Sequence, residues 1–199
     1  MKLLLISDEI HKTLYDYFRE ERWQDIDLIL SAGDLKASYL SFLVTLIKGA
    51  PLYYVRGNHD KDYAKDPPLG CVNIHGKVVD YKGLTILGIE GSRWYGGNGV
   101  EYKEWQMKWE LLKKAPHLLW THWRRNIDII LAHSPPYNLN DGDGQAHTGF
   151  KVFRTLIEKF DPAYFIHGHQ HLNYGRNERI TTYKDTKIIN AFQYYTLEI

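Results

Sequence analysis

The feature that most constrains the fold is a series of short, predominantly apolar runs separated by segments of helical character. The first three runs cover residues 3–7, 27–31 and 52–56, and we expect helices between them, over about residues 13–20 and 38–48. Apolar runs of this length are typical of strands that are buried on both faces of a sheet. The order β-α-β-α-β therefore predicts a largely parallel sheet with right-handed crossovers.

The rest of the chain continues with strands and helices in a different order. A hairpin is expected over residues 77–81 and 84–89, then a glycine-rich loop over 91–99 and a Trp- and Lys-rich helical region over about 102–123, where Pro116 could cause a break. Further strands are expected at residues 127–132, 164–166, 179–183, 187–190 and 194–199, with a helix at about 150–160. Because we find no linker, repeat or low-complexity stretch, we expect residues 1–199 to form a single domain.

Composition fits a globular protein and gives no strong preference for a partner. Of the 199 residues, 44% are hydrophobic and 25% are charged, which suits one compact domain. The net charge of +1 predicts no overall attraction to nucleic acid or acidic lipid, although a local patch stays open. Cys71 is the single cysteine, so no internal disulfide can form. The sequence has neither a signal-peptide pattern nor the ~18 apolar residues of a membrane helix, so we expect a cytoplasmic protein with no membrane partner.

Polar side chains able to bind a metal follow five of the expected strands. In chain order they are Asp8, Asp34, Asn58 with His59, His133, and His169 with His171. Ligand sites in open α/β sheets form just outside the carboxyl ends of strands, so we expect these residues to lie close together. Each of them also interrupts an apolar run, where a buried charge or imidazole is costly unless it is paired or coordinated.

The donor types indicate the kind of metal. Carboxylate, amide oxygen and imidazole, without thiolate, favour Mn, Fe or Zn and argue against a structural zinc site. One carboxylate has two oxygens, so a single Asp can bridge two ions. Two ions roughly 3.5–4 Å apart can activate a bridging hydroxide and neutralise phosphate oxygens during an in-line displacement.

Four short motifs, taken in this order, resemble the signature of the calcineurin-like metallophosphoesterases. They are Gly33-Asp34, Gly57-Asn58-His59-Asp60, the lone His133 after a strand, and Gly168-His169-Gln170-His171. Each motif is weak alone, but the ordered set, with Asp8, extends over most of the chain. The resemblance implies an α/β fold, a four-layer αββα sandwich of two mixed β-sheets flanked by helices, and hydrolysis of phosphate esters by two metal ions.

The resemblance also implies a role for each matching residue. The first metal site would use Asp8, Asp34 and His171, and the second would use Asp34, Asn58, His133 and His169. His59 would lie beside the phosphate and stabilise the transition state or protonate the leaving oxygen. Asp60 would accept hydrogen bonds behind the ligands. Arg56 would clamp a phosphate oxygen, as the matching arginine does in some phosphatases of the family.

Two departures from the family pattern affect these expectations. The first motif is usually Asp-x-His, whereas this chain reads Asp8-Glu9-Ile10, and His11 comes one residue too late to point the same way. The first metal site is therefore expected to be weak, filled by water, or occupied only when metal is plentiful. Ala37 stands where Gly-Asp-x-x-Asp-Arg-Gly would place its second Asp, which argues against a protein Ser/Thr phosphatase. The motif Gly-Ser-Arg-Trp-Tyr at 91–95 resembles a small branch of the family and does not fix a substrate.

Several of these residues also have a plain structural interpretation. Asp8 could cap the next helix, and Asn58 could simply form a turn. His133 could bond to a backbone carbonyl, and His169 and His171 could be ordinary core or surface histidines. For these residues the ordered set favours coordination. For Arg56, a surface ion pair and a functional role remain equally open.

Two loops are expected near the site. Trp94 and Tyr95 are interpreted as facing the substrate, with packing in the core as the alternative. The acidic loop at residues 141–144 does not match a calcium EF-hand, because Ala146 and Val152 stand where Gly and Glu are needed. We therefore expect this loop to be a flexible lid, in which His147 is incidental.

The expected function is hydrolysis of a phosphodiester or phosphomonoester, of a small molecule or nucleotide, through a dinuclear centre and a bridging hydroxide. A nuclease is less favoured, because long nucleic acids need a basic track that a near-zero net charge does not suggest. The alternative from another class is a protein-binding scaffold of the same fold with a degraded first metal site. Ile10 and the Trp-rich helical region keep that alternative open. The substrate, the native metals and the oligomeric state are not predicted.

Overall fold

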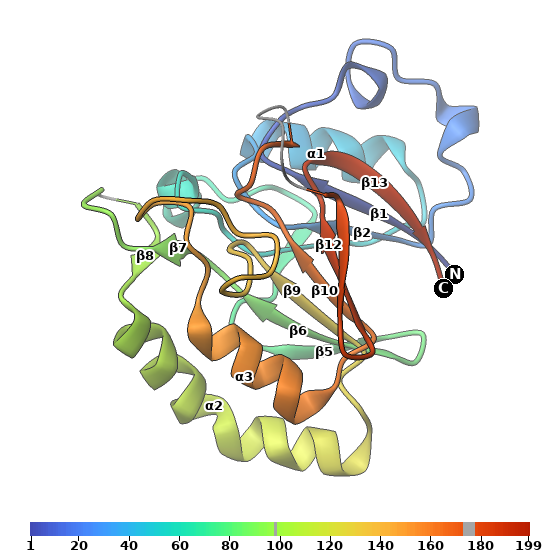
Figure 1. Cartoon of the computed structure of the whole chain (residues 1–199). Coiled ribbons are helices and arrows are strands. Elements are labelled where there is room, and N and C mark those ends of the chain that lie inside the picture. The colour runs from blue at the N-terminus through green and yellow to red at the C-terminus, as the bar shows by residue number, and fades with distance from the viewer. Residues whose placement is uncertain (98, 173–177) are drawn as a thin grey trace.

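The computed structural model in Figure 1 describes residues 1–97, 99–172 and 178–199. Its helices are α1 (Ala37–Leu46), α2 (Glu104–Arg124) and α3 (Lys151–Phe160). Its strands are β1 (Lys2–Ser7), β2 (Leu28–Ser31), β3 (Leu52–Tyr54), β4 (Cys71–Asn73), β5 (Val78–Tyr81), β6 (Leu84–Ile89), β7 (Ser92–Arg93), β8 (Glu101–Tyr102), β9 (Ile129–Ala132), β10 (Tyr164–His167), β11 (Ile180–Tyr183), β12 (Thr186–Asn190) and β13 (Gln193–Glu198). Residue 98 of the glycine-rich loop lies outside the described residues.

Two mixed sheets form the centre of the molecule. The first has the order β13-β1-β2-β3-β4, and the second has the order β11-β12-β10-β9-β6-β5. Strands β1 to β4 run parallel in chain order, which confirms the predicted parallel sheet, and β13 returns antiparallel along β1. In the second sheet, β6, β9, β10 and β12 run parallel, and β5 and β11 add antiparallel edges.

Three apolar clusters separate the layers. Alternate residues of a strand point to opposite faces, so Leu4 and Ile6 of β1 pack with α1 while Leu3 and Leu5 pack toward the second sheet. In the same way, Ile129 of β9 lies between the sheets and the next residue faces α2 and α3. Figure 1 shows α1 over the first sheet and α2 with α3 over the second. The predicted four-layer αββα sandwich is confirmed.

The segment after β1 differs from the expectation. Instead of a helix over residues 13–20, it forms two short 3₁₀ turns, Lys12–Leu14 and Glu20–Arg22. Leu14 is the only buried residue between positions 12 and 20. Helices in proteins are stabilised mainly by packing of an apolar face. The Tyr, Phe and Asp residues of this segment are also weak helix formers.

Helix α2 runs without a break through Pro116. Proline cannot donate the helical hydrogen bond to the carbonyl of Leu112, but both residues are exposed, so water can replace the missing donor. None of the helices in the described part of the chain combines the length and the apolar composition needed to cross a bilayer.

Candidate metal centre

The candidate ligands stand on sharp turns directly after their strands. Asp8 follows β1, Asp34 lies three residues beyond β2, and His169 lies two residues beyond β10; their φ angles are +64°, +57° and +67°. This left-handed conformation costs roughly 1–2 kcal/mol for a residue with a Cβ. Such strain persists only where the surroundings impose it, and it is frequent at functional sites.

Three glycines allow the ligand turns to approach one another. A Cβ on Gly57 would lie 2.0 Å from Asp34 Oδ1, and a Cβ on Gly168 would lie 2.8 Å from Asp8 Oδ2. Gly33 has a φ of +98°, and a Cβ there would lie 2.3 Å from the backbone nitrogen of Gly57. The glycines of the sequence motifs are therefore required because the turns that carry the carboxylates pack directly against their neighbours.

Four side chains from both sheets converge on one point. His133 Nε2 lies 2.9 Å from Asn58 Oδ1, 3.2 Å from His169 Nδ1 and 3.4 Å from Asp34 Oδ2. Asp34 and Asn58 come from turns of the first sheet, whereas both histidines follow strands of the second. The point of convergence therefore lies between the carboxyl ends of the two sheets.

Backbone carbonyls orient both imidazoles toward this point. His133 Nδ1 lies 2.7 Å from Ala32 O and His169 Nε2 lies 2.7 Å from Ala146 O, so these two nitrogens carry protons when the rings are neutral. The other nitrogen of each ring then presents a lone pair to the point of convergence. Imidazoles that bind metals are commonly held by such a hydrogen bond from the remote nitrogen.

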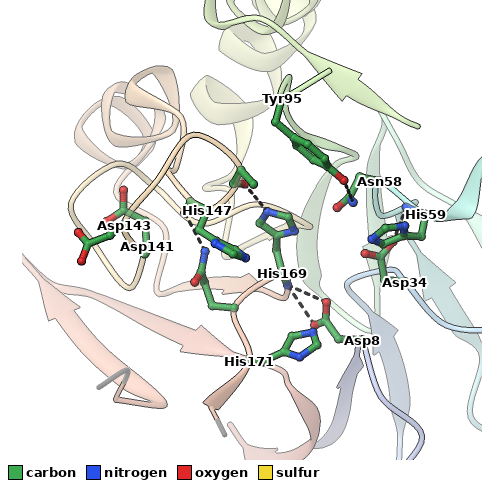
Figure 2. A pocket seen from close by; sticks show the side chains of 13 residues that line it. Asp8, Asp34, Asn58, His59, Tyr95, Asp141, Asp143, His147, His169 and His171 are labelled. Atoms are coloured by element: carbon green, nitrogen blue, oxygen red, sulfur yellow. Dashed lines mark hydrogen bonds between the residues drawn. The ribbon is translucent and has the colours of Figure 1, made fainter. Parts of the chain in front are cut away.

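The oxygens of Asp34 and Asn58 are oriented in the same direction. Asn58 Nδ2 donates to Tyr95 Oη at 3.1 Å, which leaves Oδ1 to face His133. Asp34 Oδ1 accepts the backbone N–H of His59 at 2.8 Å, and Oδ2 faces His133. Figure 2 shows Tyr95, Asn58, His59 and Asp34 together on one side of the cavity. Four acceptor atoms thus meet and repel one another unless a positive charge lies among them.

The pKa values reflect this demand for positive charge. Burial would raise the pKa of Asp34, but His133 beside it outweighs that effect and brings the value to about 2. Burial would lower the pKa of His133, yet Asp34 raises it to about 9. Burial, reinforced by His133, lowers the pKa of His169 to about 3, so that this imidazole keeps its lone pair. A proton on His133 can supply the missing charge, and so can a metal ion.

The donor set fits a metal ion. The ligand atoms of Asp34, His133 and His169 all lie within 4.8 Å of one another, and Asn58 Oδ1 adds a fourth. One carboxylate, one amide oxygen and two neutral imidazoles are typical ligands of Mn, Fe or Zn. The residues predicted for the second metal site therefore lie together in space although they are far apart in the sequence.

Asp8 and His171 lie in the same cavity beside this cluster (Figure 2). Both oxygens of Asp8 lie 3.0 Å from the backbone nitrogen of His169, and Oδ2 accepts the hydroxyl of Ser7 at 2.5 Å. Burial raises the pKa of Asp8. His171 Nδ1 lies 3.7 Å from Glu9 Oε1, so the carboxylate that follows Asp8 faces the imidazole expected in the first metal site.

His11 does not compensate for the histidine that is missing at Ile10. Its Nδ1 accepts the backbone N–H of Thr13 at 3.2 Å, and its ring packs edge-on against Tyr194 with centroids 4.8 Å apart. His11 is absent from the residues that line the cavity, as the spacing predicts.

The cavity itself has a volume of about 1080 Å³ and a strongly acidic lining. Four of its residues are aspartates, namely Asp8, Asp34, Asp141 and Asp143, and within the described part of the chain no Lys or Arg lines it. The loop that carries Asp141 and Asp143 forms one wall in Figure 2. A phosphate ester could bind to such a lining only if cations were present to neutralise it.

Comparison with known proteins shows the family of the chain. The family model described as calcineurin-like phosphoesterase matches residues 1–173. The chain belongs to this family. It is 27% identical to a UPF0046 protein of Caenorhabditis elegans, over 97% of this chain and 70% of that protein.

Two solved structures share the fold of this family member. The TT1561 protein of Thermus thermophilus is 15% identical, with a TM-score of 0.65 over 96% of this chain and 88% of that one. The calcineurin-like phosphoesterase YfkN of Bacillus subtilis is 12% identical, with a TM-score of 0.51 over 96% of this chain and 80% of that one. At these identities the two likenesses establish the fold alone.

His59 and Asp60, two of the three residues predicted to act in catalysis, both contact Asp34. The exposed His59 lines the cavity, and its backbone N–H donates a hydrogen bond to Asp34 Oδ1. Asp60 lies behind the turn, where Oδ2 accepts the N–H groups of Asp34 at 2.7 Å and Gly57 at 2.8 Å. Burial, with Asp34 nearby, raises the pKa of Asp60 to about 6. Asp60 thus accepts hydrogen bonds behind the turn of Asp34, and its role in catalysis stays a prediction.

Arg56 is engaged elsewhere. Its Nε and Nη2 each donate a hydrogen bond of 2.8 Å to the carboxylate of Glu90, which also accepts the hydroxyl of Tyr102 at 3.0 Å. Arg56 is not among the residues that line the cavity. The geometry corresponds to the ion-pair interpretation, and a phosphate clamp at this residue stays a prediction.

Sequence reasoning missed the contacts that orient the ligands. The carbonyls of Ala32 and Ala146 hold the two imidazoles, but any residue type can supply a carbonyl, so no sequence signal marks them. The loop predicted as a flexible lid contacts the ligand turn, because Gln170 Nε2 also donates to His147 O at 2.7 Å, and its role as a lid stays a prediction. Glu9 directly follows the predicted ligand Asp8 in the sequence. This adjacency is a sequence signal that could have placed the Glu9 carboxylate near His171.

Proposed function

We propose that this protein hydrolyses a phosphodiester or phosphomonoester, of a small molecule or nucleotide, at a dinuclear metal centre. The observation that carries the proposal is the convergence of acceptor atoms from Asp34, Asn58, His133 and His169 at the edge of an acidic cavity. Membership of the calcineurin-like phosphoesterase family supports phosphate esters as the substrate class.

Each of the two proposed ions has a set of candidate ligands. Asp34, Asn58, His133 and His169 would hold one ion, and Asp8, Asp34 and His171 would hold the other. Ions of the Mn, Fe or Zn type supply Lewis acidity and an activated water near neutral pH. Because no Lys or Arg of the described chain lines the cavity, these ions are also the natural counter-charge for a bound phosphate.

The surrounding side chains would orient the substrate and deliver a proton. His59 presents its imidazole to the cavity from the turn whose N–H holds Asp34, so its position is fixed relative to that ligand. We assign to His59 the protonation of the leaving oxygen. The hydroxyl of Tyr95 accepts from Asn58 Nδ2 and can donate its own proton to a phosphate oxygen.

The lining favours a small substrate over a long nucleic acid. Binding of a polyanion depends on Lys and Arg side chains that neutralise successive phosphates. The described lining offers four aspartates instead. A titration of binding against salt would separate the two substrate classes, since a steep dependence would point to nucleic acid.

The test combines metal analysis with two generic substrates. Protein loaded with manganese is assayed for metals per chain by mass spectrometry, and for turnover of bis-nitrophenyl phosphate and nitrophenyl phosphate. We expect Asp34→Asn and His169→Ala to lose metal and to lower kcat by roughly 100- to 1,000-fold. Asp143→Asn makes the same carboxylate-to-amide change in the same cavity, outside the cluster, and should keep the metal content of the wild type.

Two outcomes would contradict the proposal. One is full activity and metal content in Asp34→Asn. The other is a wild-type protein that neither binds metal nor turns over either substrate, even with added manganese. The second outcome would favour the scaffold alternative.

A further inference from the structure

Helix α2 carries a row of exposed apolar side chains along its outer face. In chain order they are Trp105, Trp109, Leu112, Leu119, Trp120 and Trp123. Trp105 is 66% exposed and Trp123 is 83% exposed. Since residues three or four apart lie on the same side of a helix, these six form one stripe, which we call the α2 stripe. A contiguous apolar surface of this kind marks an interaction site.

The fold does not account for the α2 stripe. The residues of α2 that pack on the second sheet are Met107, Leu111 and Leu118, all buried. Met107 comes two positions after Trp105, and Leu111 comes two positions after Trp109. Two helical steps of about 100° each turn the side chain to the opposite side of the helix. The helix is therefore apolar on two opposite sides, and only one of them contributes to the core.

The α2 stripe is bordered by positive charge. Residues 103–125 contain six Lys or Arg and two Glu, a formal net charge of +4 with His neutral. At about 100° per residue, Lys108 borders the stripe on one side, and Lys113 and Arg124 border it on the other. The ammonium of Lys113 lies 5.9 Å from the Trp109 ring centroid, and the guanidinium of Arg124 lies 5.1 Å from that of Trp120.

The two acids in this region are already engaged. Both carboxylate oxygens of Glu104 accept backbone N–H groups at the start of α3, and Glu110 pairs with Lys113 at 2.8 Å. Of the basic residues, Arg125 pairs with Asp80 at 2.6 Å. The outer face of α2 thus keeps a positive balance next to its tryptophans, although the whole chain is nearly neutral.

In place of the expectation of no membrane partner, we propose that the outer face of α2 docks on the surface of an anionic lipid bilayer, with the tryptophans in the headgroup region. Indole rings prefer the boundary between water and hydrocarbon. Lys and Arg beside an apolar stripe are typical of helices that lie in the plane of a membrane surface. Basic residues near such a surface are attracted to its acidic lipids.

Two other occupants fit the observations less well. A second copy of this chain, packed stripe to stripe, would bring two positively charged helices together. A nucleic acid would use the charges and could stack on tryptophan, but Leu112 and Leu119 in the middle of the stripe offer neither stacking nor hydrogen bonds. Membrane docking uses the leucines, the tryptophans and the basic border together.

The test measures sedimentation of the full chain with vesicles. Neutral phosphatidylcholine vesicles are compared with vesicles that contain about 30% phosphatidylserine. We expect the protein to bind the anionic vesicles at least about tenfold more tightly, and this preference to decline at high salt. Tryptophan fluorescence of the bound protein should be quenched by lipids brominated on their acyl chains.

Paired substitutions on exposed positions separate the α2 stripe from general hydrophobicity. Trp109→Ser with Trp123→Ser should reduce binding about tenfold or more, since each removes an exposed indole from the stripe. Tyr17→Ser with Leu69→Ser changes two equally exposed apolar side chains outside α2, at 67% and 75% exposure, and should bind like the wild type. Circular dichroism would verify that all variants are folded.

Four results would overturn the proposal. The first is equal binding of the wild type to neutral and anionic vesicles, and the second is unchanged vesicle binding of the double-Trp variant. The third is a wild-type protein that does not bind vesicles but forms a concentration-dependent dimer, which the double-Trp variant does not form. The fourth is tighter binding to single-stranded RNA than to anionic vesicles. The last two would assign the stripe to a second copy or to nucleic acid.

Discussion

Single residues at the site adopt unfavourable backbone conformations, which bring the candidate metal-ligand atoms close together. Asp8, Asp34 and His169 all occupy the left-handed region, and Gly33 beside Asp34 does so too, with a φ of +98°. For the three side-chain ligands the strain is offset by hydrogen bonds that anchor the turns. For Gly33, the absence of a Cβ removes both the strain and a clash.

A matched pair of glycine substitutions separates these two effects. Gly33→Ala and Gly49→Ala each place a Cβ at a positive φ, +98° and +86°, but only the Cβ at Gly33 meets neighbouring backbone. We expect Gly49→Ala to cost about 1–2 kcal/mol in the free energy of unfolding and to bind metal normally. Gly33→Ala should cost more and should also lose metal, because the Asp34 turn must move.

Urea unfolding and metal analysis of the two variants would check this prediction. Equal effects of both substitutions on metal content would show that the close packing of the Asp34 turn is unimportant.

Glu9 offers a second prediction at the residue scale. Its carboxylate lies 3.7 Å from His171 Nδ1, and outer carboxylates that hold a metal-binding imidazole typically contribute 10- to 100-fold in metal affinity. We expect Glu9→Gln to weaken one of two manganese-binding events by roughly that factor and to leave the other unchanged. Calorimetric titration would measure both, with Glu21→Gln, on an exposed turn, as the control.

Two unchanged binding events in Glu9→Gln would show that Glu9 does not support the first site. A single binding event in the wild-type protein would instead contradict the dinuclear proposal itself.

The helices α1, α2 and α3 and the longer buried strands could be predicted from this sequence, whereas sheet membership could not. Apolar runs located β1, β2, β3, β9 and β10 to within a few residues, because burial on both faces leaves a local signal, and the hairpin pattern located β5 and β6. The strands β4, β7 and β8 were missed, since they have two or three residues and are only partly buried. The division into two sheets came from the family resemblance, because pairing such as β13 with β1 joins the two ends of the chain.

The same distinction applies to the site. Side-chain types after strand ends identified the residues that converge, such as Asp34 and His133, because burying them without partners would be costly. The sequence could not reveal that Tyr95 orients Asn58 or that Arg56 is occupied by Glu90. These contacts depend on how loops of different sheets meet, and no local pattern records that meeting.

At the scale of elements, Arg56 and Glu90 connect the ends of β3 and β6, one strand from each sheet. Glu90 is only 2% exposed and receives two hydrogen bonds from Arg56. Removing Arg56 leaves a buried carboxylate without its counter-charge, which typically costs about 3–5 kcal/mol. We therefore expect Arg56→Ala to lower the free energy of unfolding by about that amount in a urea titration.

The exposed ion pair of Arg125 with Asp80 provides the control. Both partners are well exposed, so Arg125→Ala should have little effect on stability. If Arg56→Ala were as mild as Arg125→Ala but lost activity, the phosphate-clamp role of Arg56 would be favoured over the structural one.

For the whole molecule, the candidate centre is a link between the two sheets. Asp34 and Asn58 belong to turns of the first sheet, and His133 and His169 follow strands of the second. An ion bound to all four would add a further link between layers that meet mainly through apolar packing and are also joined by the Arg56–Glu90 pair. A ligand that binds only the folded state stabilises it by about 2.7 kcal/mol at 100 times its Kd. Metal content should therefore control the stability of the entire fold.

We accordingly expect Tm to fall by several degrees when metal is removed with a chelator, and to recover when manganese is restored. For a chain of this size, 1 kcal/mol corresponds to about 2–4 °C, so near-saturation of one site should shift Tm by roughly 5–10 °C. Asp34→Asn should melt at one temperature with or without manganese, because the carboxylate shared by the ligand sets is gone. If the Tm of the wild-type protein changed neither with chelator nor with manganese, no ion would join the sheets. The proton on His133 would then have to neutralise the cluster of acceptor atoms.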